Sequence, residues 1–79
     1  MIIKVLGTGC PKCKTLERET FNALAELDIA AEVEKVEDIV KIMNYGVMRT
    51  PGLVINEKVV LSGRVPSREE LKKIITENQ

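Results

Sequence analysis

The sequence predicts an α/β fold with a four-stranded mixed sheet and three helices, in the order β-α-β-α-β-β-α. Three observations lead to this prediction. Short runs of apolar, β-branched residues indicate strands, amphipathic stretches with capping signals indicate helices, and the last two strand signals are separated by a hairpin turn. The chain has 79 residues, so we expect one domain, residues 1–79, with a small core.

The first strand and helix are the clearest elements. Ile2–Leu6 (IIKVL) is typical of a buried strand, and a glycine-containing turn follows it. A helical pattern then runs from Pro11 to about Asp28, with the proline in the first helical position, where its missing N–H costs nothing. Cys10 is therefore expected at the N-cap. One arc of this helix contains Cys13, Leu16, Thr20, Ala23, Leu24 and Leu27.

The remaining elements carry their own signals. Residues 30–36 alternate and are charged, which is typical of an edge strand, and residues 37–44 predict a short helix that ends near Gly46. Two short strands, residues 53–55 and 59–61, are joined by a hairpin turn at residues 56–58.

A final helix begins with a capping box formed by Ser67 and Glu70. Its apolar residues, Leu71, Ile74 and Ile75, fall on one face. From the apolar pattern of the whole chain we expect core positions at Phe21, Leu24, Ile39 and Ile74, and also at Met43, Tyr45 and Met48 rather than an apolar rim.

Composition excludes several classes of function. The chain has no histidine, which removes histidine-based acid–base catalysis and mixed Cys/His zinc sites. Twelve basic residues balance twelve acidic ones and only two residues are aromatic, so nucleic-acid binding is not expected. Neither a signal peptide nor a membrane-spanning stretch is recognisable. We expect a cytoplasmic monomer.

The only two cysteines, Cys10 and Cys13, lie in one short loop. A structural disulfide is disfavoured, because a reducing cytosol does not maintain it and so short a loop gains little from closure. A helix N-terminus favours a thiolate, and Lys12 adds a positive charge that would modulate the pKa of Cys10. The second thiol, one turn further on, is placed to resolve a mixed disulfide. Redox exchange and metal binding are the two interpretations that remain.

Thr50-Pro51 precedes the third predicted strand. A proline cannot donate to a central ladder, so it belongs at a strand start, a bulge or a tight turn. In this order of elements, the segment returns beside the helix N-terminus that holds Cys10. The pair is therefore expected to lie near Cys10.

The segments GTGCPKC and TPGLVI, together with the capped terminal helix, resemble the thioredoxin/glutaredoxin superfamily over the whole chain, and most closely the small glutaredoxin-like thioredoxins. The resemblance implies a minimal thioredoxin fold in which Cys10 is the nucleophile and Cys13 the resolving thiol. It also implies that Pro51 is cis and that the Thr50 backbone pairs with a substrate segment. No cofactor is implied beyond the redox-active disulfide, and no metal.

The chain departs from the family pattern at two positions near the cysteines. Gly9 stands where many thioredoxins have tryptophan, and Lys12 replaces an aromatic residue often found in glutaredoxins. A glutathione-binding set is not recognisable. The resemblance therefore implies protein disulfide substrates and an electron donor of the thioredoxin-reductase type.

Two further interpretations stay open. A metal-chaperone module for Cu(I) or another soft metal would use the same Cys pair, although such modules have the order β-α-β-β-α-β. Glu17 follows Cys13 by one helical turn, so its carboxylate is a candidate proton acceptor that modulates this thiol. The alternative for Glu17 is an ordinary ion pair with Lys14.

Overall fold

The computed structural model describes residues 1–79 and has the element order predicted from the sequence. The elements are β1 (Ile2–Leu6), α1 (Pro11–Leu27), β2 (Glu32–Val36), α2 (Ile39–Asn44), β3 (Gly52–Ile55), β4 (Lys58–Ser62) and α3 (Arg68–Glu77). The predicted fold class is confirmed. The β-α-β-β-α-β order expected of a metal-chaperone module is not present.

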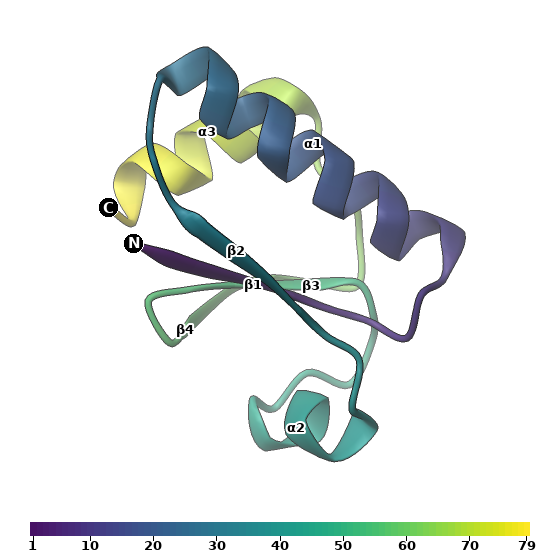
Figure 1. Ribbon diagram of the computed structural model, residues 1–79. Helices are drawn as coiled ribbons and strands as arrows, with labels where there is room; N and C mark the ends of the chain where they lie inside the picture. Colours follow the sequence, from purple (N-terminus) through teal and green to yellow (C-terminus); the bar gives the residue numbers. More distant parts are fainter.

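The four strands form one mixed sheet in the order β2-β1-β3-β4. β1 is parallel to β2 and antiparallel to β3, and β4 is antiparallel to β3. α1 and α3 cover one face of this sheet, and α2 lies on the other (Figure 1). β2 is an edge strand, as its charged pattern predicted.

Two element starts differ from the prediction by two residues. β2 begins at Glu32 rather than residue 30, because its ladder starts where Ile2 of β1 provides a partner. α2 begins at Ile39 rather than residue 37, because Asp38 is the N-cap and its carboxylate accepts the N–H of Val40 at 2.9 Å.

The hairpin between β3 and β4 is tighter than predicted. Its turn consists of Asn56 and Glu57 alone, both with positive φ (50° and 68°), and Lys58 already belongs to β4. Two central residues with φ > 0 match the right-handed twist of the flanking strands. Asn56 also accepts the N–H of Ile2 at 3.1 Å, which holds the turn against β1.

The main core lies between the sheet and the pair α1/α3. The predicted arc of α1 is confirmed, since Cys13, Leu16, Thr20, Ala23 and Leu24 are the buried residues of this helix. The prediction for Phe21 was wrong, because its side chain is 52% exposed. One residue past Thr20 is a rotation of about 100° around the helix, which takes Phe21 out of the buried arc. Ile74 is partly buried against this core.

A second, smaller cluster lies under α2. It consists of Leu6, Ile42, Val47 and Val54. The prediction of core positions at Ile39, Met43 and Met48 was wrong, because all three are exposed. α2 has only six residues and therefore turns just one side chain, Ile42, into the protein. Tyr45 packs partly buried at the margin of this cluster.

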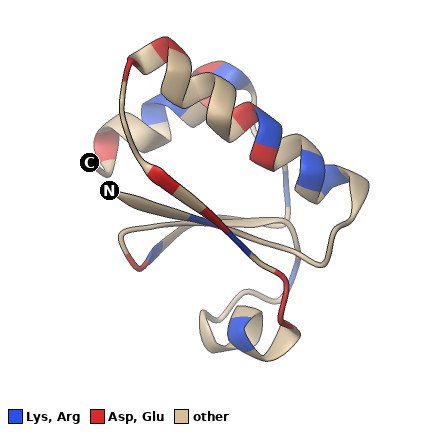
Figure 2. Cartoon of the chain, in the orientation of Figure 1, with Lys and Arg blue, Asp and Glu red and all other residues tan.

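Ion pairs connect α1 with α3. Arg68 binds Glu19 and Glu26, each at 2.9 Å, and Lys72 binds Glu26 at 3.1 Å. The capping box is only half formed. Ser67 accepts the N–H of Glu70 at 3.2 Å, but the Glu70 carboxylate binds Arg64 instead of returning to the cap. Figure 2 shows charges of both signs interspersed along these two helices.

None of the three helices combines the length and the apolar character needed to cross a lipid bilayer.

Candidate active site

Three segments meet at one end of the strands, where β1 and β2 finish and β3 begins. Leu6, the last residue of β1, pairs with Val36 on one side and with Gly52 on the other. The N–H of Gly7 then donates to the Val36 carbonyl at 2.9 Å, so the loop that follows β1 is anchored to the sheet. This loop leads into α1, and the Thr50-Pro51 segment arrives beside it.

Cys10 occupies the N-cap of α1, as predicted. Its backbone is extended (φ −67°, ψ 161°), and its Sγ accepts the N–H of Cys13 at 3.2 Å. Its carbonyl accepts the N–H of Lys14 at 3.1 Å, which is the first helical hydrogen bond. The sulfur atom therefore lies where a helix offers free N–H groups to an anion.

Cys10 and Cys13 form a disulfide with their Cα atoms 5.0 Å apart. The two cysteine residues differ in their exposure to solvent. The Cys13 side chain is only 5% exposed and belongs to the buried arc of α1, whereas Cys10 is half-buried. A second disulfide can therefore approach Cys10 more easily than Cys13.

Thr50 and Pro51 lie beside the disulfide, as predicted. Thr50 is exposed, Pro51 is buried, and the peptide bond between them is cis, as the resemblance implied. The Pro51 carbonyl accepts the N–H of Gly63 at 2.8 Å. A Cβ built on Gly7 would lie 3.9 Å from the Thr50 Cβ and would also meet Cys13, which shows how closely these segments approach.

The other two candidate residues lie on α1. Lys12 is exposed in the first turn and forms no ion pair. Glu17 is 26% exposed and pairs with Lys35 of β2 at 3.8 Å rather than with Lys14, because α1 packs across the sheet beside β2. Their roles at the thiols remain predictions.

An apolar hollow of about 270 Å³ adjoins the disulfide loop. It is lined by Thr8, Ile39, Ile42, Met43, Val47, Met48 and Thr50. This hollow was not predicted from the sequence, because Met43 and Met48 were expected in the core. The available signal was the shortness of α2, which leaves most of its apolar side chains without a place inside the protein.

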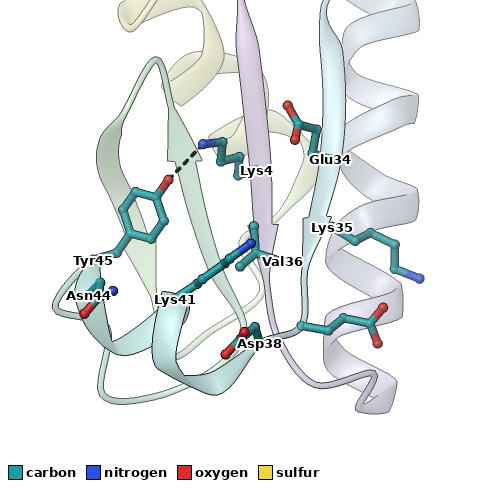
Figure 3. Close-up of a pocket in the computed structure, with 9 residues that line it drawn as sticks. Lys4, Glu34, Lys35, Val36, Asp38, Lys41, Asn44 and Tyr45 are labelled. Carbon is teal, nitrogen blue, oxygen red and sulfur yellow. Dashed lines mark hydrogen bonds between the residues drawn. The ribbon is translucent and has the colours of Figure 1, made fainter.

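A second hollow, of about 370 Å³, lies between β1, β2 and α2 (Figure 3). Lys4 donates to Glu57 at 2.8 Å and to the Tyr45 hydroxyl at 2.9 Å. Hydrogen bonding to Glu57 and then to Tyr45 raises the pKa of Lys4 above its usual range. Side chains of both charges line this hollow, and these contacts connect the β-hairpin turn to α2.

No group of three or more His, Cys, Asp or Glu side chains is arranged to hold a metal ion.

Comparison with known proteins agrees with this geometry. A family model described as a thioredoxin domain matches residues 1–76. A thioredoxin from Methanothermobacter thermautotrophicus is 41% identical over 76 residues, which cover 96% of this chain and 99% of the relative. A thioredoxin from Methanocaldococcus jannaschii is 40% identical over 73 residues, which cover 92% of this chain and 84% of the relative.

The fold, the paired cysteines and these relatives define a thiol–disulfide oxidoreductase. The chain belongs to the thioredoxin domain family. Members of this family need no cofactor beyond the redox-active disulfide. In general they act on protein disulfides, and a reductase-type donor reduces them again.

Proposed function

We propose that this protein reduces disulfide bonds in other proteins by dithiol exchange through the motif Cys10-Pro11-Lys12-Cys13. The observation that carries the proposal is the unequal placement of two paired sulfurs. Cys10 caps a helix and is partly exposed, whereas Cys13 is buried one turn further on. Exchange requires an activated sulfur that reaches the substrate and a second sulfur that is protected from it.

The first step is attack by the Cys10 thiolate on one sulfur of the substrate disulfide. The substrate S–S bond breaks, a mixed disulfide with Cys10 forms, and the other substrate sulfur leaves as a thiolate that takes up a proton. The helix N-terminus stabilises the Cys10 thiolate, and the Cys13 N–H already points at this sulfur. Lys12 contributes a nearby positive charge in this proposal.

The second step is attack by Cys13 on the Cys10 sulfur. The Cys10–Cys13 disulfide forms, the second substrate sulfur leaves, and in total two electrons and two protons have passed to the substrate. We assign Glu17 as an acceptor of the Cys13 proton. A thioredoxin-reductase-type donor then returns two electrons and two protons to the disulfide, in a cytoplasm that keeps thiols reduced. The protein acts as a monomer in this scheme.

The substrate segment binds across Thr50 and the adjoining apolar hollow. Thr50 is an exposed residue whose backbone would form hydrogen bonds with an extended peptide, while Met43 and Met48 offer flexible apolar contacts that adapt to different side chains. Such a surface suits a polypeptide better than the small, charged glutathione molecule.

The test is to trap the intermediate. Cys13→Ser is expected to accumulate a mixed disulfide with a disulfide-bonded model protein, because the resolving thiol is missing. The trapped species is counted by mass spectrometry after alkylation of the free thiols. Cys10→Ser serves as the matched control and should trap nothing. Trapping by Cys10→Ser but not by Cys13→Ser would reverse the assigned roles.

A further inference from the structure

We propose that Gly7 is a positioning residue for this exchange, because its lack of a side chain leaves the space that the Cys13 sulfur occupies. We call this space the seat of the Cys13 sulfur. The seat holds that sulfur where it can bond to Cys10, and it therefore favours the disulfide over the dithiol. This inference rests on the proposed function and assigns to a non-reacting residue the control of the resolving thiol.

The geometry around Gly7 leaves no room for a side chain. A Cβ on this residue would overlap with the Cys13 Sγ and would lie 3.0 Å from the Cys13 Cβ. Real Cβ atoms very rarely approach other heavy atoms so closely. Gly7 is not among the glycines with positive φ, which are Gly9, Gly46 and Gly63. Glycine is therefore required here for steric reasons and not for its backbone conformation.

Neither partner of this contact can move away easily. Gly7 is fixed to the sheet through its hydrogen bond to Val36 at 2.9 Å. Cys13 lies in the first turn of a helix that is packed into the core through the fully buried Leu16. Its Cβ position follows from the helix backbone, so a change of rotamer moves the sulfur but leaves the short contact with the Cβ.

An added methyl group at residue 7 would push the Cys13 sulfur out of its seat. The disulfide suffers more from this displacement than the dithiol, because only the disulfide needs both sulfurs at bonding distance. The dithiol can accept a different Cys13 rotamer. The substitution should therefore shift the redox equilibrium towards the dithiol and delay resolution of mixed disulfides.

The direct test is the equilibrium of Gly7→Ala with dithiothreitol. In this reaction the protein disulfide and reduced dithiothreitol give the protein dithiol and cyclic oxidised dithiothreitol, with transfer of two electrons and two protons. We expect the equilibrium constant to shift at least tenfold towards the protein dithiol, which corresponds to a potential about 30 mV more positive. A shift of less than twofold in a folded variant would overturn the proposal.

Gly46→Ala is the matched control. Gly46 has φ +80° and no atom within 4 Å of a built Cβ, so alanine strains the backbone without approaching the cysteines. A purely structural substitution lowers the stability of both redox forms alike and leaves the potential unchanged. Gly46→Ala should behave in this way, whereas Gly7→Ala should not.

A second comparison covers the case in which Gly7→Ala does not fold. Urea unfolding is measured for Cys13→Ala and for the double variant Gly7→Ala/Cys13→Ala, where the sulfur is absent. The loss of stability caused by alanine at residue 7 should be smaller in this background than in the reduced parent chain. An equal loss in both backgrounds, or a double variant that also fails to fold, would contradict a seat for the sulfur.

The two proposals fail in different ways. If the parent protein shows a reversible couple and Gly7→Ala leaves its potential unchanged, only the role of Gly7 is lost. If the parent shows no reversible couple, the proposed function is lost, and the urea comparison still decides whether Gly7 seats the Cys13 sulfur.

Discussion

The two faces of the sheet are built very differently. Strands alternate their side chains, so β1 sends Ile3 and Val5 towards α1 and α3, and Leu6 towards α2. The α1/α3 face has ten buried residues in its cluster, and ion pairs join its two helices. The α2 face has four, and its exposed residues include Met43 and Met48.

This difference gives the α1/α3 face most of the stability and, in the proposed function, gives the α2 face the binding of substrate. Most of the apolar area that stabilises the fold is buried under the two long helices. The α2 face buries little and leaves apolar side chains in water next to the disulfide, where a substrate segment can cover them. The active site lies between these two faces, at the end of the sheet where β1 and β2 finish.

Truncation of a core side chain on each face gives the largest expected effect. Leu71→Ala, on the buried face of α3, should lose roughly 2–5 kcal/mol of stability, which is a large fraction of the total for so short a chain. Ile42→Ala, on the α2 face, should lie at the low end of that range because a small cluster can relax around the gap. Urea unfolding measures both. A greater loss of stability for Ile42→Ala would contradict the conclusion that the α1/α3 face provides most of the stability.

Removal of the exposed methionines should impair binding without affecting stability. Met43→Ala/Met48→Ala is expected to raise KM for a polypeptide disulfide several-fold, since these side chains line the hollow. Its free energy of unfolding should lie within about 0.5 kcal/mol of the parent value. Val40→Ala is the control, because Val40 is equally exposed on α2 but does not line the hollow. Equal KM values for all three proteins would show that the hollow does not bind substrate.

Glu17 tests whether the α1 side of the site takes part in the chemistry. Glu17→Gln removes the proposed proton acceptor and should slow the release of a trapped mixed disulfide several-fold near neutral pH, with a changed pH profile. Lys35→Met is the control, since it breaks the ion pair but keeps the carboxylate. An unchanged profile for Glu17→Gln would remove this residue from the mechanism.

The smallest expected effect is the loss, at acid pH, of the stability that ion pairs between α1 and α3 contribute. Hydrogen bonds from Asn22 and Arg68 lower the pKa of Glu19, and those from Lys72 and Arg68 lower the pKa of Glu26. A carboxyl with a lowered pKa in the folded state stabilises the fold above its unfolded pKa of about 4.3. That contribution is lost as the pH falls through the lower, folded value.

Arg68→Met should therefore make stability less dependent on pH below about 4.3. Urea midpoints at pH 7 and pH 3 provide the measurement, and the effect should be small because these pairs are exposed. A pH dependence identical to that of the parent would show that the ion pairs do not stabilise this face.

The fold was predictable from local signals. Each of these signals depends on neighbours in the sequence, and all are present in the structure: the β-branched run of β1, the apolar arc of α1, the hairpin turn and the cap at Ser67. The errors concern side chains whose environment depends on distant elements. Ile39 is apolar but points away from the core, which only the packing of α2 on the sheet decides. Phe21 is the exception, because its position one residue past Thr20 already places it outside the apolar arc of α1.

The site was predictable in part for the same reason. The N-cap position of Cys10 follows from the local pattern, whereas the cis bond before Pro51 was inferred from the family resemblance. The Lys35 partner of Glu17, the apolar hollow and the contact between Gly7 and Cys13 arise from residues brought together by the sheet. Sequence spacing carries no signal for the two side-chain contacts, whereas the shortness of α2 was an available signal for the hollow.

Dithiol exchange by Cys10 and Cys13 is tested most directly by the midpoint potential of this couple. The complete, metal-free chain is equilibrated anaerobically in graded dithiothreitol buffers, and alkylation followed by mass spectrometry gives the fraction of dithiol. We expect a reversible two-electron transition with a midpoint of about −200 to −300 mV. Thiols that do not close reversibly into an intramolecular disulfide would contradict it.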